Sequence, residues 1–586
     1  MAVNIIFLML FSLAFSGIGR KIFRRAVADD KFSPAEQLIF SLGLGIGFFE
    51  ILGMTLGLLG LFYKEIFYFL LVGILVATLP EWTGVLKQIS QIKLPSGRVA
   101  KTILVLIVVR LAFNFLAAQA PVTEGDALWY HVTLPKIFIR EHRLVDTYLL
   151  AAYLPFNTEM LYVWGMLIKD EILAQSLSFL VGGIFLTASI YLFAKRFFSA
   201  TVASLAALIF IFTPVVSWES VTPSVDLFWT MWVLLGFWAL RRQRAVLAGI
   251  FLGLNLGTKG VLGFLPIAAM LPILAGWKRR NIATVATIAG LFFAPFVLRN
   301  FWLTGNAFFP FLPQFFGGGG IDPQLLASIH QQILAKSITL TGLFKSFWDV
   351  SLFPQKYGPD IGPLYLIFVP AGAIIFWRSK KSTTAKLAAG LGLIFYVLWY
   401  LLAVATSRYL LPVFPFLAIL VAATAVYLIK LARITKILTM TILVLSVPMS
   451  FLTFFWTFEP YGPKIKAALG VYGREEYILR LLPYTADFFW INKNLPPEAK
   501  VILYLNPWQR MFYLDRPFIV AGNLQREIDF SRPEKLNNRS WFLDQLKSHS
   551  VTHVYSLAPV LDQAHLEELY HGDSGNVYRI IYENGL

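Results

Sequence analysis

Apolar segments long enough to cross a bilayer recur along most of this chain. A transmembrane helix needs about 20 predominantly apolar residues. Hydrophobic residues make up 57% of the 586 residues and charged ones only 14%, and mean hydropathy is +0.67, which excludes an ordinary soluble protein. We therefore expect an α-helical polytopic membrane protein with about fourteen transmembrane helices. The expected spans lie near 2–19, 37–62, 66–80, 102–120, 171–194, 200–216, 224–240, 246–257, 261–276, 281–298, 361–377, 387–405, 409–428 and 437–456.

Basic residues gather in short clusters between these segments. Lys/Arg-rich short loops mark the cytoplasmic side of a membrane protein. Every cluster follows an odd-numbered segment, which predicts that both termini are extracytoplasmic. The net charge of +17 belongs to this membrane part, because residues from 459 onward hold 14 Lys/Arg and 15 Asp/Glu, so we expect no nucleic-acid partner. The clusters lie at 20–31, 87–101, 195–196, 241–244, 278–280, 378–386 and 430–436.

Residues 459–586 change character and alternate strand-like with helical patterns. They predict a small extracytoplasmic α/β domain. The expected organisation is extra N-terminal transmembrane helices in 1–100, a transmembrane core in 101–458 and this domain in 459–586. Strands are expected at 501–505, 517–522, 551–557 and 576–582, and helices near 484–494, 538–549 and 560–571.

The stretch PVTEGDALWYHVTLPK (121–136) opens the first large outer loop. Charges near hydrocarbon are costly and are rarely kept without a partner or a function. This favours a site around Glu124 and Asp126, beside His131. Trp129 and Tyr130 are typical of an interfacial aromatic belt, but aromatic faces also stack on sugars.

Further polar groups are predicted on the same side of the membrane. They come from separate motifs, TPSVDLFW, GTKG, RNFWLTGN and SRYLLPVFP. We expect acids and cations to converge at one face, where an anionic ligand would balance the cations. The residues are Asp226, Lys259, Arg299, Asn300, Arg408 and Tyr409.

The order of these motifs resembles the GT-C superfamily of integral-membrane glycosyltransferases. It is most similar to the branch of protein O-mannosyltransferases and lipid A aminoarabinose transferases, over roughly residues 100–430. The resemblance implies transfer of a sugar from a polyprenyl-phosphate donor to a lipid, glycan or protein acceptor at the extracytoplasmic face. It also implies a place in the lipid bilayer of the bacterial cytoplasmic membrane. Asp126 and Asp226 match the two acids of the family.

The chemistry explains these residue types. A carboxylate can take the acceptor's proton, and cations must hold the departing phosphate. The resemblance makes Asp126 the base and Asp226 a helper, with phosphate held by Lys259, Arg299 and Arg408. Residues expected to bind substrate are Glu124, Trp129, Tyr130, His131, Asn300 and Tyr409.

Two positions depart from the family pattern. Asp126 is followed by Ala127 where relatives carry acidic pairs. The stretch YLPFNTEM (153–160) lacks the Lys-Pro-Pro of many relatives, which leaves Lys136 and Lys169 as further cations.

Three alternatives stay open from the sequence. Glu124 and Asp126 could hold a divalent metal, although hard cations want more oxygen ligands than this loop offers, so no cofactor is expected. The chain could instead be a transporter or flippase of a lipid-linked sugar, but no repeated halves are visible. It could also be a non-catalytic assembly protein.

Other stretches carry structural expectations. Residues 299–360, with GGGG at 317–320, are long enough for a lid, with an unstructured loop as the alternative. Glu50 and Arg110 lie inside spans at comparable depth, which predicts an ion pair. His549 and His553 form only a weak zinc pattern.

Overall fold

The computed structural model describes most of the chain, and these residues form two compact units. The first unit consists of Met1–Ala120, Pro155–Ala294 and Ile333–Leu469, and the second of Pro121–Leu154, Pro295–Gln332 and Gly470–Leu586. The domain boundaries predicted at 100 and 458 stay a prediction. The described residues are 1–27, 32–92, 97–334, 338–378, 383–404, 406–456, 461–506, 509–522, 525–528, 530, 538–557 and 565–582.

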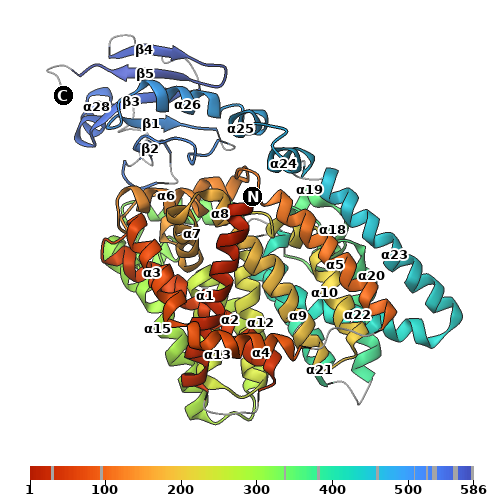
Figure 1. The fold of residues 1–586 in the computed structure, drawn as a ribbon. Helices are drawn as coiled ribbons and strands as arrows, with labels where there is room; N and C mark the ends of the chain where they lie inside the picture. The colour runs from red at the N-terminus through yellow and green to blue at the C-terminus, as the bar shows by residue number, and fades with distance from the viewer. Residues whose placement is uncertain are drawn as a thin grey trace. The chain divides into compact units, whose positions relative to one another are not determined.

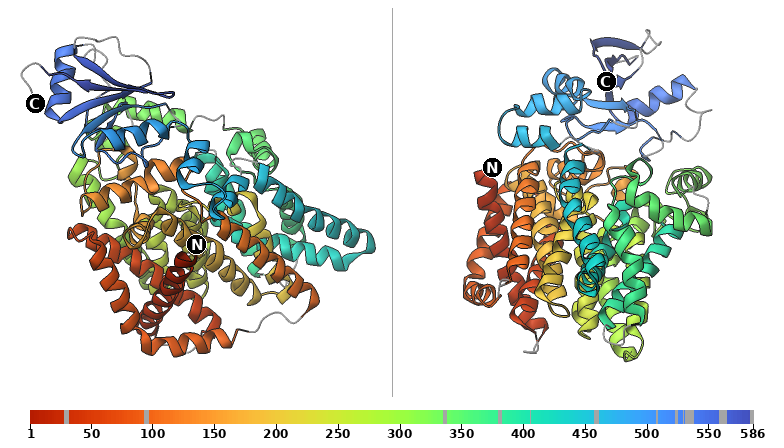
Figure 2. Two further views of the ribbon diagram at one scale, coloured as in Figure 1. Left: turned by 45° about the horizontal axis from the view of Figure 1, so that its top comes forward. Right: turned by 90° about the vertical axis from the view of Figure 1, so that its right-hand side faces the viewer.

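The first unit is built from helices that run side by side as a bundle (Figure 2). In a bilayer each backbone N–H and C=O must be satisfied within its own segment, so apolar stretches like these fold as helices. Its elements are α1 (Ala2–Ala26), α2 (Pro34–Leu58), α3 (Lys64–Ala77), α4 (Leu79–Ser90), α5 (Arg98–Ala117), α7 (Asn157–Ile168), α8 (Glu171–Ser178), η3 (Phe179–Phe185), α9 (Leu186–Lys195), α10 (Ala200–Phe212), α11 (Pro214–Glu219), α12 (Asp226–Arg241), α13 (Ala245–Lys259), η4 (Gly260–Gly263), α14 (Phe264–Met270), η5 (Leu271–Leu274), most of α15 (Arg279–Thr304), α18 (Leu340–Leu352), α19 (Pro354–Tyr357), α20 (Pro363–Arg378), α21 (Thr383–Leu402), η6 (Ser407–Val413), α22 (Phe414–Leu431), α23 (Arg433–Trp456) and α24 (Tyr461–Ala468).

The part of the chain that the structure describes contains 8 helices long and apolar enough to cross a membrane. The bent pair α3 and α4, at 66° to each other, raises this to 9 if it is one span. The predicted count of fourteen is therefore not confirmed. Residues 245–274 form one candidate span where two were expected, and Ala200–Phe212 is too short to qualify. The chain is nonetheless an integral membrane protein, as its apolar helices indicate.

Helices α1 and α2 approach closely through small residues. A Cβ on Gly45 would lie 1.9 Å from the backbone oxygen of Phe15, and a Cβ on Gly19 would lie 1.7 Å from that of Ser41. Helix association in membranes depends on such packing, because lipid offers no hydrophobic driving force between helices. These glycines therefore set the distance between the two helices.

The predicted ion pair between Glu50 and Arg110 is wrong. Glu50 accepts a hydrogen bond from the Thr158 hydroxyl at 3.1 Å. The Arg110 Nε donates to Ser217 at 3.0 Å, and its guanidinium lies 5.0 Å from the ring centroid of Phe451. Depth in a membrane does not fix the side of a helix to which a residue points, so equal depth could not identify partners.

The second unit combines loops of the membrane part with the C-terminal α/β region (Figure 1). Its elements are the π-helical turn η1 (Ala127–His131), α6 (Thr133–Arg140), the 3-10 turn η2 (Leu150–Tyr153), the end of α15, α16 (Pro313–Phe316), most of α17 (Pro323–Leu334), α25 (Arg474–Leu481), α26 (Thr485–Asn494), α28 (Arg539–Ser548), β1 (Lys500–Tyr504), β2 (Phe518–Val520), β3 (Val551–Ser556), β4 (Leu566–His571) and β5 (Asn576–Ile580).

The five strands form one mixed sheet in the order β2-β1-β3-β5-β4. Strand β1 runs parallel to β2 and β3, whereas β5 is antiparallel to β3 and β4. Helix α28 packs on the face that carries Ile502 and Val554, through Leu546. Tyr555 points to the opposite face, where it donates to Asp487 of α26 at 2.9 Å.

The sequence patterns of this region are largely confirmed. The helices expected near 484–494 and 538–549 are α26 and α28, and the four expected strands are β1, β2, β3 and β5. The helix expected near 560–571 is wrong, since 566–571 is strand β4; residues 558–564 lie outside the described part. The hydrogen-bonded pairing of this segment with β5 outweighed the helical spacing of its apolar residues.

The described residues of 299–360 are mostly helical, which does not fit the alternative of an unstructured loop. Helices α16 and α17 belong mainly to the second unit, and α18 and α19 to the first. A lid role for this stretch stays a prediction.

Replacement of Gly45 by alanine is expected to lower the melting temperature of the purified protein in detergent. The added methyl group must push α1 away from α2, and overpacking of this kind typically costs about 1–3 kcal/mol. The matched control is Gly73→Ala in α3, where a Cβ meets nothing within 4 Å. The control should be neutral or slightly stabilising, because alanine is the better helix former. Equal melting temperatures for both variants would contradict the close-approach interpretation.

Candidate functional site

A buried ion pair lies at the ends of two helices of the first unit. The Lys259 Nζ is 2.9 Å from the Asp226 Oδ1, and both side chains are almost fully buried. Asp226 is the first residue of α12, and Lys259 is the last residue of α13. A carboxylate is stabilised at a helix N-terminus and a cation at a C-terminus, so each helix dipole favours the charge it carries.

The turn after Lys259 requires glycine. Gly260 has φ +53° and ψ −123°, and a Cβ there would also lie 2.9 Å from Pro155. Glycine alone adopts such a conformation at low cost. Inside the turn, the Asn255 side chain donates to the Gly263 carbonyl at 2.9 Å and accepts from the Trp229 indole at 2.7 Å. These bonds tie α13 to α12 and fix the position of Lys259.

Glu219 is a further buried carboxyl beside this pair. It ends α11 and accepts a hydrogen bond from the Ser224 hydroxyl. Burial, then the negative charge of Asp226, raises the pKa of Glu219 to about 8, although Arg408 and Lys259 act in the opposite direction. Because α11 lies outside the candidate spans, this carboxyl belongs to a connection between helices. Burial therefore favours the neutral form of this carboxyl.

Arg408 and Tyr409 complete this group from the 3-10 segment η6. The Lys259 Nζ lies 4.9 Å from the ring centroid of Tyr409, and the Arg408 guanidinium lies 5.3 Å from the same centroid. Both residues are partly buried. Glu219, Ser224, Asp226, Lys259, Arg408 and Tyr409 are called the Asp226 cluster below.

The loop that carries Asp126 belongs to the second unit. Asp126 is partly buried and precedes the turn η1. The Arg510 Nε donates to the carbonyl of Gly125 at 3.1 Å, and its guanidinium lies 5.7 Å from the Trp129 ring centroid. Burial lowers the pKa of Arg510, while the charge of Asp126 acts to raise it. Asp126 thus lies close to a cation that comes from the C-terminal region.

The same loop is fastened to residues 509–515 at further points. The Tyr513 hydroxyl donates to the Val122 carbonyl at 2.7 Å. The Lys136 ammonium donates to the carbonyl of Phe512 at 2.6 Å and pairs with Asp515 at 2.6 Å. Lys136 is therefore engaged in holding the loop, which makes it a poor replacement for a phosphate-binding lysine.

The other predicted residues of this loop are mostly buried. Glu124 is 1% exposed and accepts from the backbone N–H of Thr123 at 3.2 Å. His131 is buried, and its ring centroid is 4.0 Å from that of Tyr130. These contacts fit a structural role in the loop as well as a binding role.

Arg299 and Asn300 hold the turn η2. Arg299 donates to the Ala152 carbonyl at 3.0 Å and lies 5.6 Å from the ring centroid of Tyr153. Asn300 donates to the carbonyls of Tyr153 and Phe309 at 2.8 and 2.9 Å. The acceptors of these hydrogen bonds are backbone carbonyl oxygens of the second unit.

The structure thus brings together Asp226, Lys259, Arg408 and Tyr409 within one unit. Glu124, Asp126, Arg299 and Asn300 belong to the other unit, and convergence of the two groups stays a prediction. Sequence reasoning missed Glu219 and Arg510. The sequence offered a signal for Glu219, because it is the one charged residue between Arg196 and Asp226. Nothing in the sequence around Arg510 indicated that it would lie near Asp126.

Lys169 forms an ion pair with its neighbour Asp170 at 2.8 Å. Within the described part of the chain, no three His, Asp or Glu side chains are grouped so that they could hold a metal ion. The Glu124 and Asp126 pair would need ligands from elsewhere for that purpose.

Comparisons with known proteins give similarity to solved structures only. No protein-family model matches the sequence, and no curated protein matches it. ArnT from Cupriavidus metallidurans bound to undecaprenyl phosphate is 15% identical with a TM-score of 0.48, over 82% of this chain and 98% of that chain. The Archaeoglobus fulgidus oligosaccharyltransferase tethered with an acceptor peptide is 15% identical with a TM-score of 0.45, over 78% and 69%.

AglB from Archaeoglobus fulgidus, in complex with an inhibitory peptide and a dolichol-phosphate, is 13% identical with a TM-score of 0.43, over the same shares of the two chains. These proteins are GT-C superfamily members, the superfamily that the sequence motifs resemble. At these identities and scores the similarity by itself carries no functional conclusion.

Loss of the lysine charge should destabilise the fold. In Lys259→Met the carboxylate of Asp226 stays buried without its partner, and breaking one side of a buried pair typically costs about 3–5 kcal/mol. The double variant Asp226→Asn, Lys259→Met should recover part of this loss. The measurement is the free energy of unfolding in mixed micelles.

The matched control is Lys169→Met, whose pair with Asp170 is partly exposed and should contribute no more than about 1 kcal/mol. A Lys259→Met variant as stable as this control would show that the pair does not stabilise the first unit.

Proposed function

We propose that the protein is a membrane glycosyltransferase that moves a sugar from a polyprenyl-phosphate-linked donor to an acceptor at the extracytoplasmic face. The observation that carries the proposal is the buried Asp226 cluster at the ends of α11, α12 and α13. The expected location is the bacterial cytoplasmic membrane, with both termini outside. The GT-C neighbours bound to undecaprenyl phosphate and dolichol-phosphate support the same class of donor.

The charge of the cluster suits a phosphate. The cluster places two cations, Lys259 and Arg408, beside the buried carboxyls of Asp226 and Glu219. Such cations can bind an anionic ligand in a place of low dielectric, where electrostatic interactions are strong. Lys259 and Arg408 would hold the departing phosphate and stabilise the charge that develops on it during transfer. Asp226 would keep Lys259 oriented, which makes it a positioning residue.

Arg299 is assigned a smaller part in this proposal. Its guanidinium already donates to a backbone carbonyl and lies against Tyr153. Tyr409, whose ring borders both cations of the cluster, is the better candidate to line the donor site.

Asp126 would act as the general base that takes the proton of the acceptor. It is partly accessible, unlike Asp226, so an acceptor from the aqueous side can reach it. The nearby Arg510 stabilises its ionised form, which is the form that a base requires. Glu124, Trp129, Tyr130 and His131 would shape the acceptor side of the loop, where the aromatic rings offer stacking surfaces to a sugar.

Replacement of Asp126 by asparagine should reduce transfer by about 10²–10⁴-fold, the usual contribution of general-base catalysis. The assay follows radiolabelled sugar leaving polyprenyl-phosphate donors in membranes with matched protein levels. Asp515→Asn is the control, because it removes an exposed charge from the segment that holds the same loop, and it should stay near wild type.

Wild-type rates in Asp126→Asn would refute the assigned base. A chelator should leave transfer unchanged, and loss of transfer in chelator would favour the metal alternative at Glu124 and Asp126. Movement of the carrier across the bilayer, with no transfer from any donor, would make the protein a transporter.

A further inference from the structure

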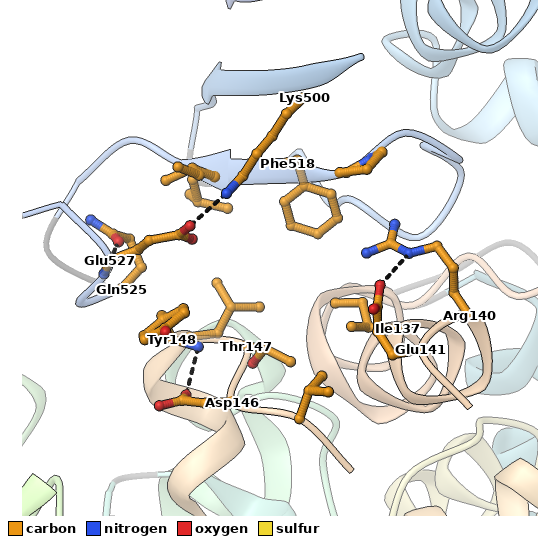
Figure 3. Close-up of a pocket in the computed structure, with 15 residues that line it drawn as sticks. Ile137, Arg140, Glu141, Asp146, Thr147, Tyr148, Lys500, Phe518, Gln525 and Glu527 are labelled. Carbon is orange, nitrogen blue, oxygen red and sulfur yellow. Dashed lines mark hydrogen bonds and ion pairs between the residues drawn. The ribbon is translucent and has the colours of Figure 1, made fainter. Parts of the chain in front are cut away.

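A pocket of about 290 Å³ lies within the second unit, along strand β2 (Figure 3). One wall is Phe518 and Val520 of this strand. The opposite wall is the segment 145–149, together with Ile137 of α6. Asp126 does not line the pocket, so the pocket is distinct from the proposed transfer site.

Strand β2 is an edge strand with one open side. Among the strands that the structure describes, the sheet order places only β1 beside it. The backbone N–H of Ala521 donates to the carbonyl of Leu503 in β1, and the N–H of Val501 in β1 donates to the carbonyl of Pro517. The odd-numbered residues from 517 to 521 therefore direct their backbone groups to β1. Because backbone groups alternate in direction along a strand, the N–H and C=O groups of Phe518 and Val520 point away from the sheet. None of the described residues bonds to the backbone groups of these two.

The two edges of the sheet differ in chemistry. The other edge strand, β4, carries Glu567, Glu568 and His571, and charges of this kind protect an edge from pairing with another chain. Strand β2 reads FIV and has no charged residue. The open edge of β2 therefore lacks protection by charge, although the strand is short and follows Pro517.

The charged side chains of the pocket already have partners. Lys500 pairs with Glu527 at 2.6 Å, and Arg140 pairs with Glu141 at 3.0 Å, as Figure 3 shows. Asp146 pairs with Arg526 at 2.5 Å. With its charges matched in this way, the pocket presents apolar walls and backbone groups, so it does not suit a phosphate or another ion.

The chain beside the pocket already pairs in a strand-like manner. Leu149 and Gln525 form an isolated antiparallel bridge, and Arg526 donates its backbone N–H to the Tyr148 carbonyl at 2.9 Å. This pairing fixes the far wall opposite β2, although the backbone turns at Tyr148, where φ is +58°. The result is a slot with the edge of β2 on one side and the segment 145–149 on the other.

We propose that this slot binds an extended polypeptide segment, which adds a strand to the open edge of β2. An edge of alternating N–H and C=O groups is complementary to another polypeptide backbone, and side-chain pockets on the walls provide selectivity. The proposal goes beyond sugar transfer, because it names a polypeptide partner and a surface that the transfer site does not include.

The test uses the full-length protein in nanodiscs and a fluorescent, terminally blocked hexapeptide of alternating threonine and valine. Wild type should bind it saturably in fluorescence anisotropy. Val520→Pro removes the outward N–H without touching the ladder to β1, and proline is tolerated on edge strands. Binding should weaken about tenfold or more, as expected when a backbone donor is lost and its partner is left unmet. Val520→Thr, which keeps shape and N–H, should bind like wild type.

A second arm needs no variant. The same hexapeptide methylated on alternate amide nitrogens should lose binding to wild type to the same degree. Equal binding of both peptides, equal binding by Val520→Pro at an unchanged melting temperature, or no saturable binding would overturn the proposal. Displacement of the peptide by maltotetraose, with loss of that sugar's binding in Val520→Pro, would make the slot a glycan site and overturn it as well.

The two proposals can fail separately. Peptide binding should persist in Asp126→Asn, since Asp126 is not part of the slot. Absence of sugar transfer by a protein that still binds the peptide would refute only the proposed transfer. Absence of peptide binding by a protein that still transfers sugar would refute only the proposed slot.

Discussion

A lysine ammonium buried among apolar helices needs a carboxylate within hydrogen-bond reach, and Asp226 at the start of α12 meets this need for Lys259. The free-energy cost of burying one charge alone is several kcal/mol, about the net stability of a domain. Helix α12 must therefore begin at Asp226 where α13 ends at Lys259. The glycine turn and the Asn255 bonds maintain that meeting point.

This constraint explains which parts of the site could be predicted. Asp226, Lys259, Arg408 and Tyr409 stand at the ends of apolar segments, so hydropathy alone placed them near the boundaries of helices. Since charges in such places need partners, their association followed from general cost arguments. Four of the five C-terminal strands and two helices of that region were also predictable, because periodicity within ten residues encodes them.

Contacts between distant residues were not predictable from local pattern. Arg510 reaches the Asp126 loop across 385 positions from Gly125, and nothing in its own neighbourhood marks it. Glu50 and Arg110 illustrate the same limit, because their true partners, Thr158 and Ser217, lie on helices whose packing the sequence does not reveal. A helix was expected where strand β4 lies, because the pairing of β4 with β5 is a tertiary interaction that the local sequence pattern does not reveal.

The second unit draws on three separate stretches of the chain, and this has a consequence for biosynthesis. The loop at 121–136 leaves the ribosome long before Tyr513, which lies 391 positions after the Val122 that it holds. Until the last fifth of the chain has been made and folded, the loop lacks its fastenings to residues 509–515. A chain interrupted before residue 509 would carry the membrane helices but would lack these contacts to the loop of Asp126.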